Sequence, residues 1–280
     1  MKACDLYSRS RGIMNRLRIY LTTTFCITWT CWWSLVLLTH TGTIAYGQPF
    51  FMVIYMTGGL GPTIAAYVAV LATPVQSPLR EFHARLFRWR VAWWWYVLVL
   101  ALPVALALVS LALASLIEAH PRLSTGMPVL PWYMFFALFP VMILGGGLEE
   151  LGWRGVAQPE TERLIARPAA AVLVGLIWAV WHLPLFFLPG AGQYGTNFFM
   201  FLLGVVGNAL ILAWIYGRTS SILLCIFFHA SFNATAALGL GIPGGKGWLS
   251  TLNVCFGLLA GALLLAVASV KSDKAATINL

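Results

Sequence analysis

The polar side chains of this chain that could carry out chemistry fall into three short motifs. They are GGGLEELGWRG at residues 145–155, WAVWH at 178–182 and HASFN at 229–233. Apolar residues surround all three, and an ionisable group in apolar surroundings costs free energy, so these groups are candidates for a functional site. The candidates are Glu149, Glu150, Arg154, His182, His229 and Asn233.

A carboxylate, two imidazoles and an amide that meet in an apolar chamber can hydrolyse a peptide bond. Glu149 can take a proton from water as a general base, and His182 can orient that water. His229 with Asn233 can donate hydrogen bonds to the oxyanion that forms when water attacks an amide. The side chains of Glu149, His182 and His229 could instead hold a zinc ion with one open position, although the chain has no HExxH motif. The spacing does not choose between these two chemistries.

Helical periodicity separates the roles of the two glutamates. Residues four apart share one helix face, so Glu150 and Arg154 can form an ion pair, and His229 and Asn233 point into one cavity. Glu149 is turned by about 100° from its neighbour. It is therefore free to face the two histidines.

The elements that position these motifs are membrane spans. The chain has 280 residues and is 60% hydrophobic and 9% charged, whereas a soluble domain is roughly 25% charged. A span needs roughly 20 apolar residues, and eight runs meet that length, at about 18–39, 50–73, 92–117, 132–158, 169–188, 197–216, 220–240 and 248–270. The runs are continuous, unlike the alternating segments of a membrane β-barrel. We therefore expect an all-α integral membrane protein, a single polytopic domain over residues 1–280 with about eight transmembrane helices.

Depth in the membrane brings the three catalytic candidates close to a common plane. If the run 132–158 is one helix, Glu149 lies roughly 15 Å from its basic end, at 1.5 Å per residue. The same rise places His182 roughly 21 Å and His229 roughly 14 Å from that face. Three glycines at 145–147 lack side chains, so they allow a close neighbour or a local bend just before the glutamates.

The positive charge of the chain indicates its topology. Fifteen of the 17 Lys and Arg residues lie in the N-terminal segment and in alternate loops, and only Arg122 and Lys246 lie in the others. Lys and Arg are enriched on the cytoplasmic side, so both termini are expected in the cytoplasm. The net charge of +9 then belongs to one membrane face. We expect a multi-pass protein of the cell membrane, in contact with the lipid bilayer and with no nucleic-acid partner.

The three motifs, in this order on separate spans, resemble those of the CPBP family of intramembrane proteases, also called Abi or type II CAAX prenyl endopeptidase-like proteins. EELGWR fits EExxxR, WAVWH resembles FxxxH with Trp178 where Phe is usual, and HASFN fits HxxxN. The resemblance covers roughly residues 130–240, the expected catalytic core. It implies a helical membrane fold whose eukaryotic relatives remove the last three residues of prenylated CAAX proteins.

The resemblance also implies roles for single residues. Glu149 and His182 would activate water, His229 and Asn233 would stabilise the oxyanion, and the remaining motif residues, Glu150, Arg154 and Trp178, would support the site. It implies a glutamate-dependent mechanism that requires no cofactor, with zinc as the alternative.

We expect an endopeptidase that hydrolyses a peptide bond of a membrane-associated or lipidated, CAAX-like substrate. One alternative is a non-catalytic membrane scaffold or bacteriocin-immunity factor that binds a partner through the same polar chamber. Another is a proton-coupled carrier, because carriers also place acids and histidines at the membrane midplane. No internal repeat is present, and a single span carries acidic residues, which favours the enzyme.

Overall fold

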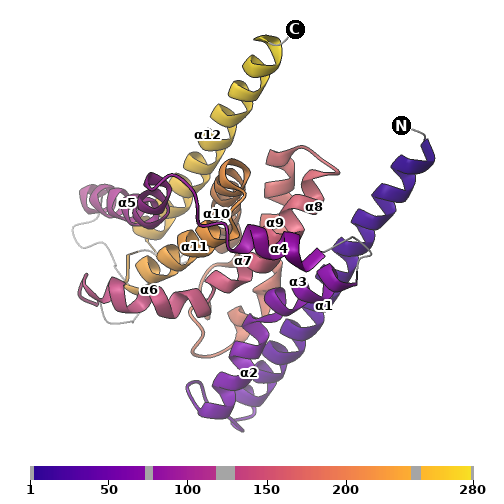
Figure 1. Ribbon diagram of the computed structural model, residues 1–280. Coiled ribbons are helices and arrows are strands. Elements are labelled where there is room, and N and C mark those ends of the chain that lie inside the picture. Colours follow the sequence, from indigo (N-terminus) through magenta and orange to yellow (C-terminus); the bar gives the residue numbers. More distant parts are fainter. Residues whose placement is uncertain (1–2, 73–77, 118–129, 241–246, 279–280) are drawn as a thin grey trace.

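The computed structural model describes residues 3–72, 78–117, 130–240 and 247–278, and the side chains of these residues from 12 to 267. The described residues contain helices and connecting loops and no strand (Figure 1). This confirms the all-α fold class.

Within its described residues, the first half of the chain forms six α-helices and one short 3₁₀ turn. They are α1 (Ala3–His40), α2 (Pro49–Gly59), α3 (Gly61–Leu71), α4 (Pro78–Leu86), α5 (Trp94–Ile117), α6 (Met134–Leu144) and the short turn η1 (Gly147–Glu149). The remaining elements are α7 (Glu150–Gly152), η2 (Trp153–Ala157), α8 (Gln158–Glu162), α9 (Arg167–Trp181), η3 (Leu183–Phe187), α10 (Phe198–Thr219), α11 (Ile222–Ala237) and α12 (Trp248–Ile278).

Within the described ranges, six segments are helical, long and apolar enough to cross a membrane, or seven if the bent pair α2 and α3 forms one span. The expected number of eight is therefore too high. The segment expected at 220–240 forms α11, which has 16 residues. At 1.5 Å per residue this helix is about 24 Å long, shorter than a hydrocarbon core of roughly 30 Å. The chain is a multi-pass membrane protein by the length and composition of its helices.

Glycines and a proline bend the second span. Helices α2 and α3 meet at an angle of 43°. The bend brings Gly58 against the ring of Trp32 and Gly61 against the Thr28 side chain, so closely that a Cβ atom at either glycine would collide. Small residues allow such close helix contacts, and here they seat the second span on α1.

The fourth span is not the single regular helix that we expected over 132–158. Helix α6 ends at Leu144, and Gly146 has a φ of 154°, a conformation that only glycine adopts readily. The chain then continues through the 3₁₀ turn η1, one turn of α-helix and the π-helical turn η2. π-Helical turns are rare in proteins, and those that occur often lie at functional sites. The break occurs immediately before the two glutamates.

Helix α10 lies at the centre of the bundle and packs against α9, α11 and α12. Small residues permit these contacts: a Cβ atom on Gly175 would lie 2.9 Å from the Ala209 side chain, and one on Gly207 would lie 2.8 Å from the Leu258 backbone nitrogen. In a membrane, where lipid is as apolar as the helices, such close packing is a main source of helix association.

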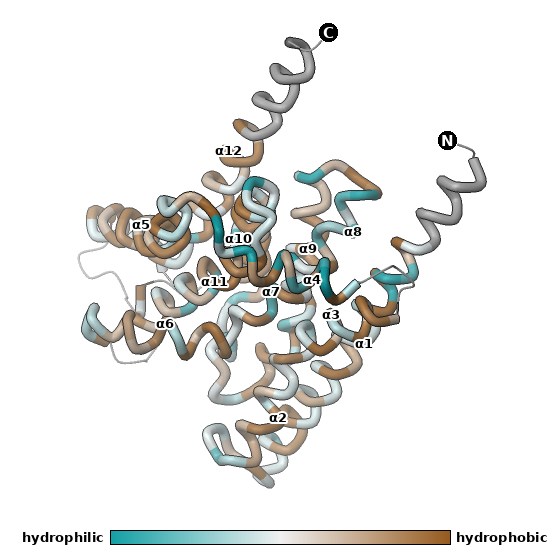
Figure 2. Tube along the Cα trace, in the orientation of Figure 1, coloured by the Kyte–Doolittle hydropathy of each residue, from teal (hydrophilic) through white to brown (hydrophobic). Residues whose placement is uncertain are grey.

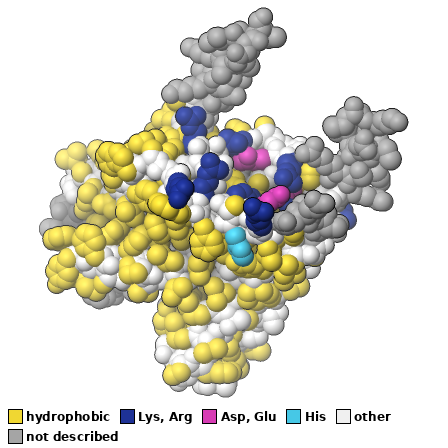
Figure 3. Space-filling model, in the orientation of Figure 1, with side chains coloured by type: hydrophobic (Ala, Val, Ile, Leu, Met, Phe, Trp, Pro, Cys, Tyr) yellow, Lys and Arg dark blue, Asp and Glu magenta, His cyan; other side chains and the backbone are white. Residues whose placement is uncertain are grey.

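Charged side chains collect at one end of the bundle, the end from which both chain termini project (Figures 1 and 3). Hydrophilic residues are also concentrated there, around α4 and α8 (Figure 2). Glu160 on α8 accepts from Arg16 and from Arg163, both at 2.8 Å, which ties α8 to α1. We call this end of the bundle, which carries Arg16, Arg163 and Glu160, the arginine face. The side of the membrane that it faces stays a prediction, and Arg122 and Lys246 lie outside the described residues.

Candidate active site

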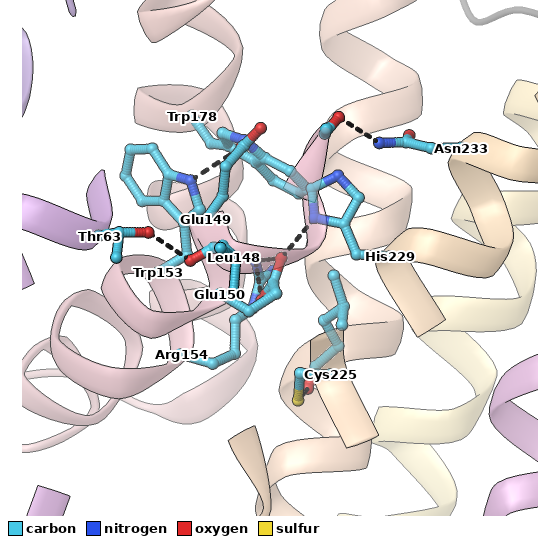
Figure 4. Close-up of polar contacts among 12 residues, drawn as sticks. Thr63, Leu148, Glu149, Glu150, Trp153, Arg154, Trp178, Cys225, His229 and Asn233 are labelled. Carbon is cyan, nitrogen blue, oxygen red and sulfur yellow. Dashed lines mark hydrogen bonds and ion pairs between the residues drawn. The ribbon is translucent and has the colours of Figure 1, made fainter. Parts of the chain in front are cut away.

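A cavity of about 360 Å³ lies among the spans. Four of the predicted site residues line it: Glu149, His182, His229 and Asn233. They come from η1, the end of α9 and the middle of α11, segments that lie far apart in the sequence. Trp178 also lines the cavity, so all three motifs meet there (Figure 4).

Glu149 is the acidic residue of the cavity wall. It is 8% exposed, and two indole groups donate to the same carboxylate oxygen, Oε2. The Trp178 Nε1–H group donates at 2.8 Å and the Trp153 Nε1–H group at 3.4 Å. Among the described residues, Oε1 of this carboxylate has no hydrogen-bond partner, so it is the oxygen that can interact with a molecule in the cavity.

Glu150 points away from the cavity into a fully buried cluster. Arg154 forms an ion pair with it at 3.0 Å, and both side chains are completely buried. The His229 Nδ1–H group donates to Glu150 Oε1 at 2.9 Å. The expected ion pair is thus present. Glu149 and His229 line the same cavity, and the hydrogen bond from His229 to Glu150, across 79 residues of sequence, was not expected from the sequence.

His182 also lines the cavity. Its Nδ1–H group donates to the Trp178 backbone oxygen at 3.0 Å, since a carbonyl oxygen can only accept. In a neutral ring the other nitrogen, Nε2, then has a lone pair that can accept a hydrogen bond from water. The ring is packed edge-on against Trp181 and Phe201, with centroid distances of 4.6 and 5.1 Å, so its orientation is fixed.

The break in the fourth span places the backbone of Gly145 and Gly146 against the side chains of the third motif, His229 and Asn233. A Cβ atom on Gly146 would collide with Asn233 Nδ2 and would lie 3.2 Å from His229 Nε2. The Asn233 Nδ2 atom also lies 3.5 Å from the Gly145 carbonyl oxygen, a long contact. Two polar nitrogens, one imidazole and one amide, therefore converge at the position of Gly146.

The predicted zinc ligands do not form a ready metal site. Among the described residues, no three His, Cys, Asp or Glu side chains are grouped so that they could hold a metal ion. The Glu149 carboxylate is bound by indoles, and one ring nitrogen of each histidine is committed to a protein acceptor. Glu149 Oε1 and the Nε2 atoms of His182 and His229 stay uncommitted, so zinc held by these three side chains stays the alternative that a chelator experiment tests.

Two contributors to the site were missed from the sequence. Trp153 lies four residues after Glu149, and that spacing could have predicted its hydrogen bond. Thr63 on α3 donates to the backbone oxygen of Leu148 at 2.7 Å and holds the turn that carries the glutamates. No sequence signal indicates Thr63, because the contact crosses from another span.

The fold and the site together define a class: a helical membrane protein whose spans bury a glutamate, two histidines and an asparagine around one cavity. Residues 128–235, which carry all three motifs, match the family model described as "Type II CAAX prenyl endopeptidase Rce1-like". The "CAAX prenyl protease 2" of Methanococcus maripaludis is 25% identical over 240 residues, which cover 79% of this chain and 84% of that relative. Over its three motifs the chain is thus similar to the Rce1-like type II CAAX prenyl endopeptidase (CPBP) family, the family that those motifs resemble.

Proposed function

We propose that this protein is an intramembrane endopeptidase and that Glu149 activates the water that cleaves the peptide bond. The observation that carries the proposal is the carboxylate itself, which has one oxygen fixed by two indoles and the other turned to a cavity that two histidines share. Residues 130–240 would form the catalytic core within one membrane domain.

The reaction begins with a water molecule between Glu149 and His182. As the water oxygen attacks the carbonyl carbon of the substrate, Glu149 Oε1 accepts a proton from the water. His182 Nε2 accepts a second hydrogen bond from the same water and orients it. The tetrahedral intermediate then collapses, the carbon–nitrogen bond breaks, and the proton passes from Glu149 to the departing amine.

The oxyanion of the intermediate would be held at the convergence of His229 Nε2 and Asn233 Nδ2. The Nδ1–H group of His229 already donates to Glu150, so donation from Nε2 requires a ring that is protonated on both nitrogens. The Glu150 carboxylate favours that ring, as a buried acid does for the histidine of a hydrolytic triad. Arg154 in turn keeps the Glu150 carboxylate oriented.

The proposed reaction uses no metal ion. The carboxylate supplies the base and the third motif supplies the oxyanion donors, so every step has a protein group assigned to it. A purified enzyme treated with a strong chelator is expected to keep its activity. Loss of activity on chelation, with recovery on adding zinc, would move Glu149, His182 and His229 to the role of metal ligands.

The substrate class that we propose is a membrane-associated peptide or a lipidated, CAAX-like protein, by similarity to the relative named above. The cavity lies among membrane spans, so such a substrate can reach it while its apolar part stays in the bilayer. The proposed location is the cell membrane. The proposal includes no nucleic-acid partner.

The test is cleavage of a quenched-fluorescent peptide library by the protein purified in detergent. The library contains prenylated and unprenylated CAAX-like peptides, and the enzymes are the wild type and Glu149→Gln. We expect the wild type to cleave a subset and the variant to cleave none. If a folded wild type cleaves no member, the chamber is a binding site of a scaffold or immunity factor instead. If Glu149→Gln cleaves as fast as the wild type, the protein is an enzyme in which Glu149 is not the base.

A further inference from the structure

We propose that Trp178 and Trp153 are positioning residues, whose indole N–H groups fix one oxygen of Glu149 and so direct the other toward the cavity. The inference rests on the proposed role of Glu149 as the base. It gives Trp178 a function beyond the shape of the pocket, and it adds Trp153, which occupies one of the unspecified positions of EExxxR.

The two hydrogen bonds have unequal strength. At 2.8 Å, the bond from Trp178 to Glu149 Oε2 has the length of a charge-assisted hydrogen bond. The bond from Trp153 to the same oxygen is 3.4 Å long, which is at the weak end of the range. The described residues offer Oε1 no donor. Trp178 therefore sets the orientation of the Glu149 carboxylate. The weaker bond from Trp153 to the same oxygen further restricts the rotation of that carboxylate.

Trp178 is itself held in place by the rest of the site. It is 3% exposed, its ring lies 5.2 Å from the His229 ring, and the Arg154 guanidinium lies 5.0 Å from its centroid. Its backbone oxygen accepts the hydrogen bond from His182. One residue thus contacts both histidines and Glu149, and its indole cannot turn away without disturbing them.

The indole N–H group is the part of Trp178 that matters in this inference. Phenylalanine at the same position would keep an aromatic ring against His229 and would offer no donor to Glu149. A carboxylate without its donor can adopt several orientations, and its ionised form loses a hydrogen bond. Hence the tryptophan at this position adds a function that the phenylalanine of an FxxxH motif cannot supply.

The chain offers a matched control in Trp181, three residues further along α9. Trp181 is also fully buried, but its Nε1–H group has no hydrogen-bond partner among the described residues. Trp181→Phe removes as much ring volume as Trp178→Phe and no hydrogen bond. Packing effects should therefore be similar in the two variants, and an effect of the N–H group should appear only at position 178.

The test compares kcat and KM of the wild type, Trp178→Phe, Trp153→Phe and Trp181→Phe on one cleaved peptide. Loss of a hydrogen bond to a charged group predicts a kcat roughly 10- to 100-fold lower for Trp178→Phe. KM should stay within about twofold, because phenylalanine keeps an aromatic ring in the cavity wall and the lost N–H group bonds Glu149. Trp153→Phe and Trp181→Phe should each lose less than Trp178→Phe, since Trp181→Phe removes packing against His182 and no hydrogen bond. Wild-type kcat in Trp178→Phe, or an equal loss in Trp181→Phe, would overturn the proposal.

A second measurement does not depend on cleavage. The resonance Raman band that reports indole N–H hydrogen bonding is recorded for the wild type minus Trp178→Phe, and again in a Glu149→Leu background. We expect a strongly hydrogen-bonded N–H signal that disappears with Glu149→Leu. A weakly bonded signal, or one that Glu149→Leu leaves unchanged, would refute the positioning role even if no substrate is found, whereas an inactive wild type would count against the proposed function alone.

If Trp178→Phe does not fold, β-(benzothienyl)alanine at position 178 replaces it. This analogue keeps the size of the indole and puts sulfur in place of the N–H group. The same loss of kcat is expected, and an unchanged kcat would contradict the proposal.

Discussion

Glu149 and Glu150 are adjacent in the chain, yet their carboxylates have different surroundings. Glu149 lines the cavity and accepts hydrogen bonds from two neutral indoles, so its charge has no cationic partner in direct contact. Glu150 is fully buried between Arg154 and His229. A buried carboxylate that is paired with an arginine stays ionised and is suited to orienting a histidine. A carboxylate without a cationic partner more readily accepts a proton from water.

At this scale the Glu150–Arg154 pair gives a prediction about stability. Removing one member of a buried ion pair typically costs about 3–5 kcal/mol, because the other charge stays buried. We expect Arg154→Met to lower the free energy of unfolding by about that amount. Arg163→Met is the control, since Arg163 is half exposed where it pairs with Glu160 and should cost less than about 1 kcal/mol.

Unfolding of the two arginine variants in mixed detergent micelles would measure this difference. Equal stability of Arg154→Met and Arg163→Met would show that the buried arginine is not needed to balance Glu150.

At the scale of elements, the break in the fourth span is the feature that makes a site possible. A regular helix would have put side chains where Asn233 and His229 approach the backbone of Gly146. The left-handed φ of this glycine ends α6 and turns the chain into η1. The next turn then presents Glu149 to the cavity and Glu150 to the protein interior.

The break predicts different outcomes for two neighbouring glycines. Gly146→Ala should lower cleavage at least roughly tenfold, because the new Cβ atom displaces Asn233 and His229, and it should cost about 1–3 kcal/mol in backbone strain. Gly145 has a φ of −83°, and a Cβ atom there would lie 3.5 Å from its nearest neighbour, an ordinary contact. Gly145→Ala should therefore keep nearly full activity. Assays of both variants on one peptide decide the matter, and equal activities would contradict this account of the break.

The sequence predicted the helices and the members of the site better than it predicted their contacts. Long apolar runs indicate spans, and motif spacing placed Glu150 beside Arg154 and His229 beside Asn233. It did not predict that η1 and η2 interrupt the fourth span, because the deviation depends on how the glycines pack against α11. Likewise, the contact of His229 with Glu150 and the contact of Trp178 with Glu149 cross between spans, and no local pattern reports them.

At the scale of the whole molecule, the cavity and the arginine face lie at different ends of the bundle. Helix α9 starts at Arg167, which pairs with Glu162 of α8, and ends beside His182. The cavity continues beyond His182 to Tyr46 and Gln193, in the two loops at the far end of α1 and α9. Glu150 and Arg154 do not line the cavity and are completely buried.

This arrangement makes a prediction about the side from which substrate enters. If the arginine face is cytoplasmic, as the distribution of positive charge predicts, the cavity opens away from the cytoplasm. In a background with all five cysteines replaced by alanine, Tyr46→Cys should react with a membrane-impermeant maleimide added to intact cells. Arg80→Cys, on the arginine face, should react only after the cells are permeabilised. The reverse pattern would mean that the chain is inserted the other way and that substrate enters from the cytoplasm.

The most direct test of the central claim is the cleavage rate of Glu149→Gln relative to the wild type, with both enzymes freed of metal by a chelator. Glutamine keeps the shape of Glu149 and can still contact Trp178, but it cannot take a proton. General-base catalysis contributes roughly 10²- to 10⁴-fold, so the account predicts a chelated wild type at full rate and a folded variant slower by about that factor. A variant that cleaves at the wild-type rate, or a wild type that stops on chelation and recovers with zinc, would contradict the claim that Glu149 activates water without a metal ion.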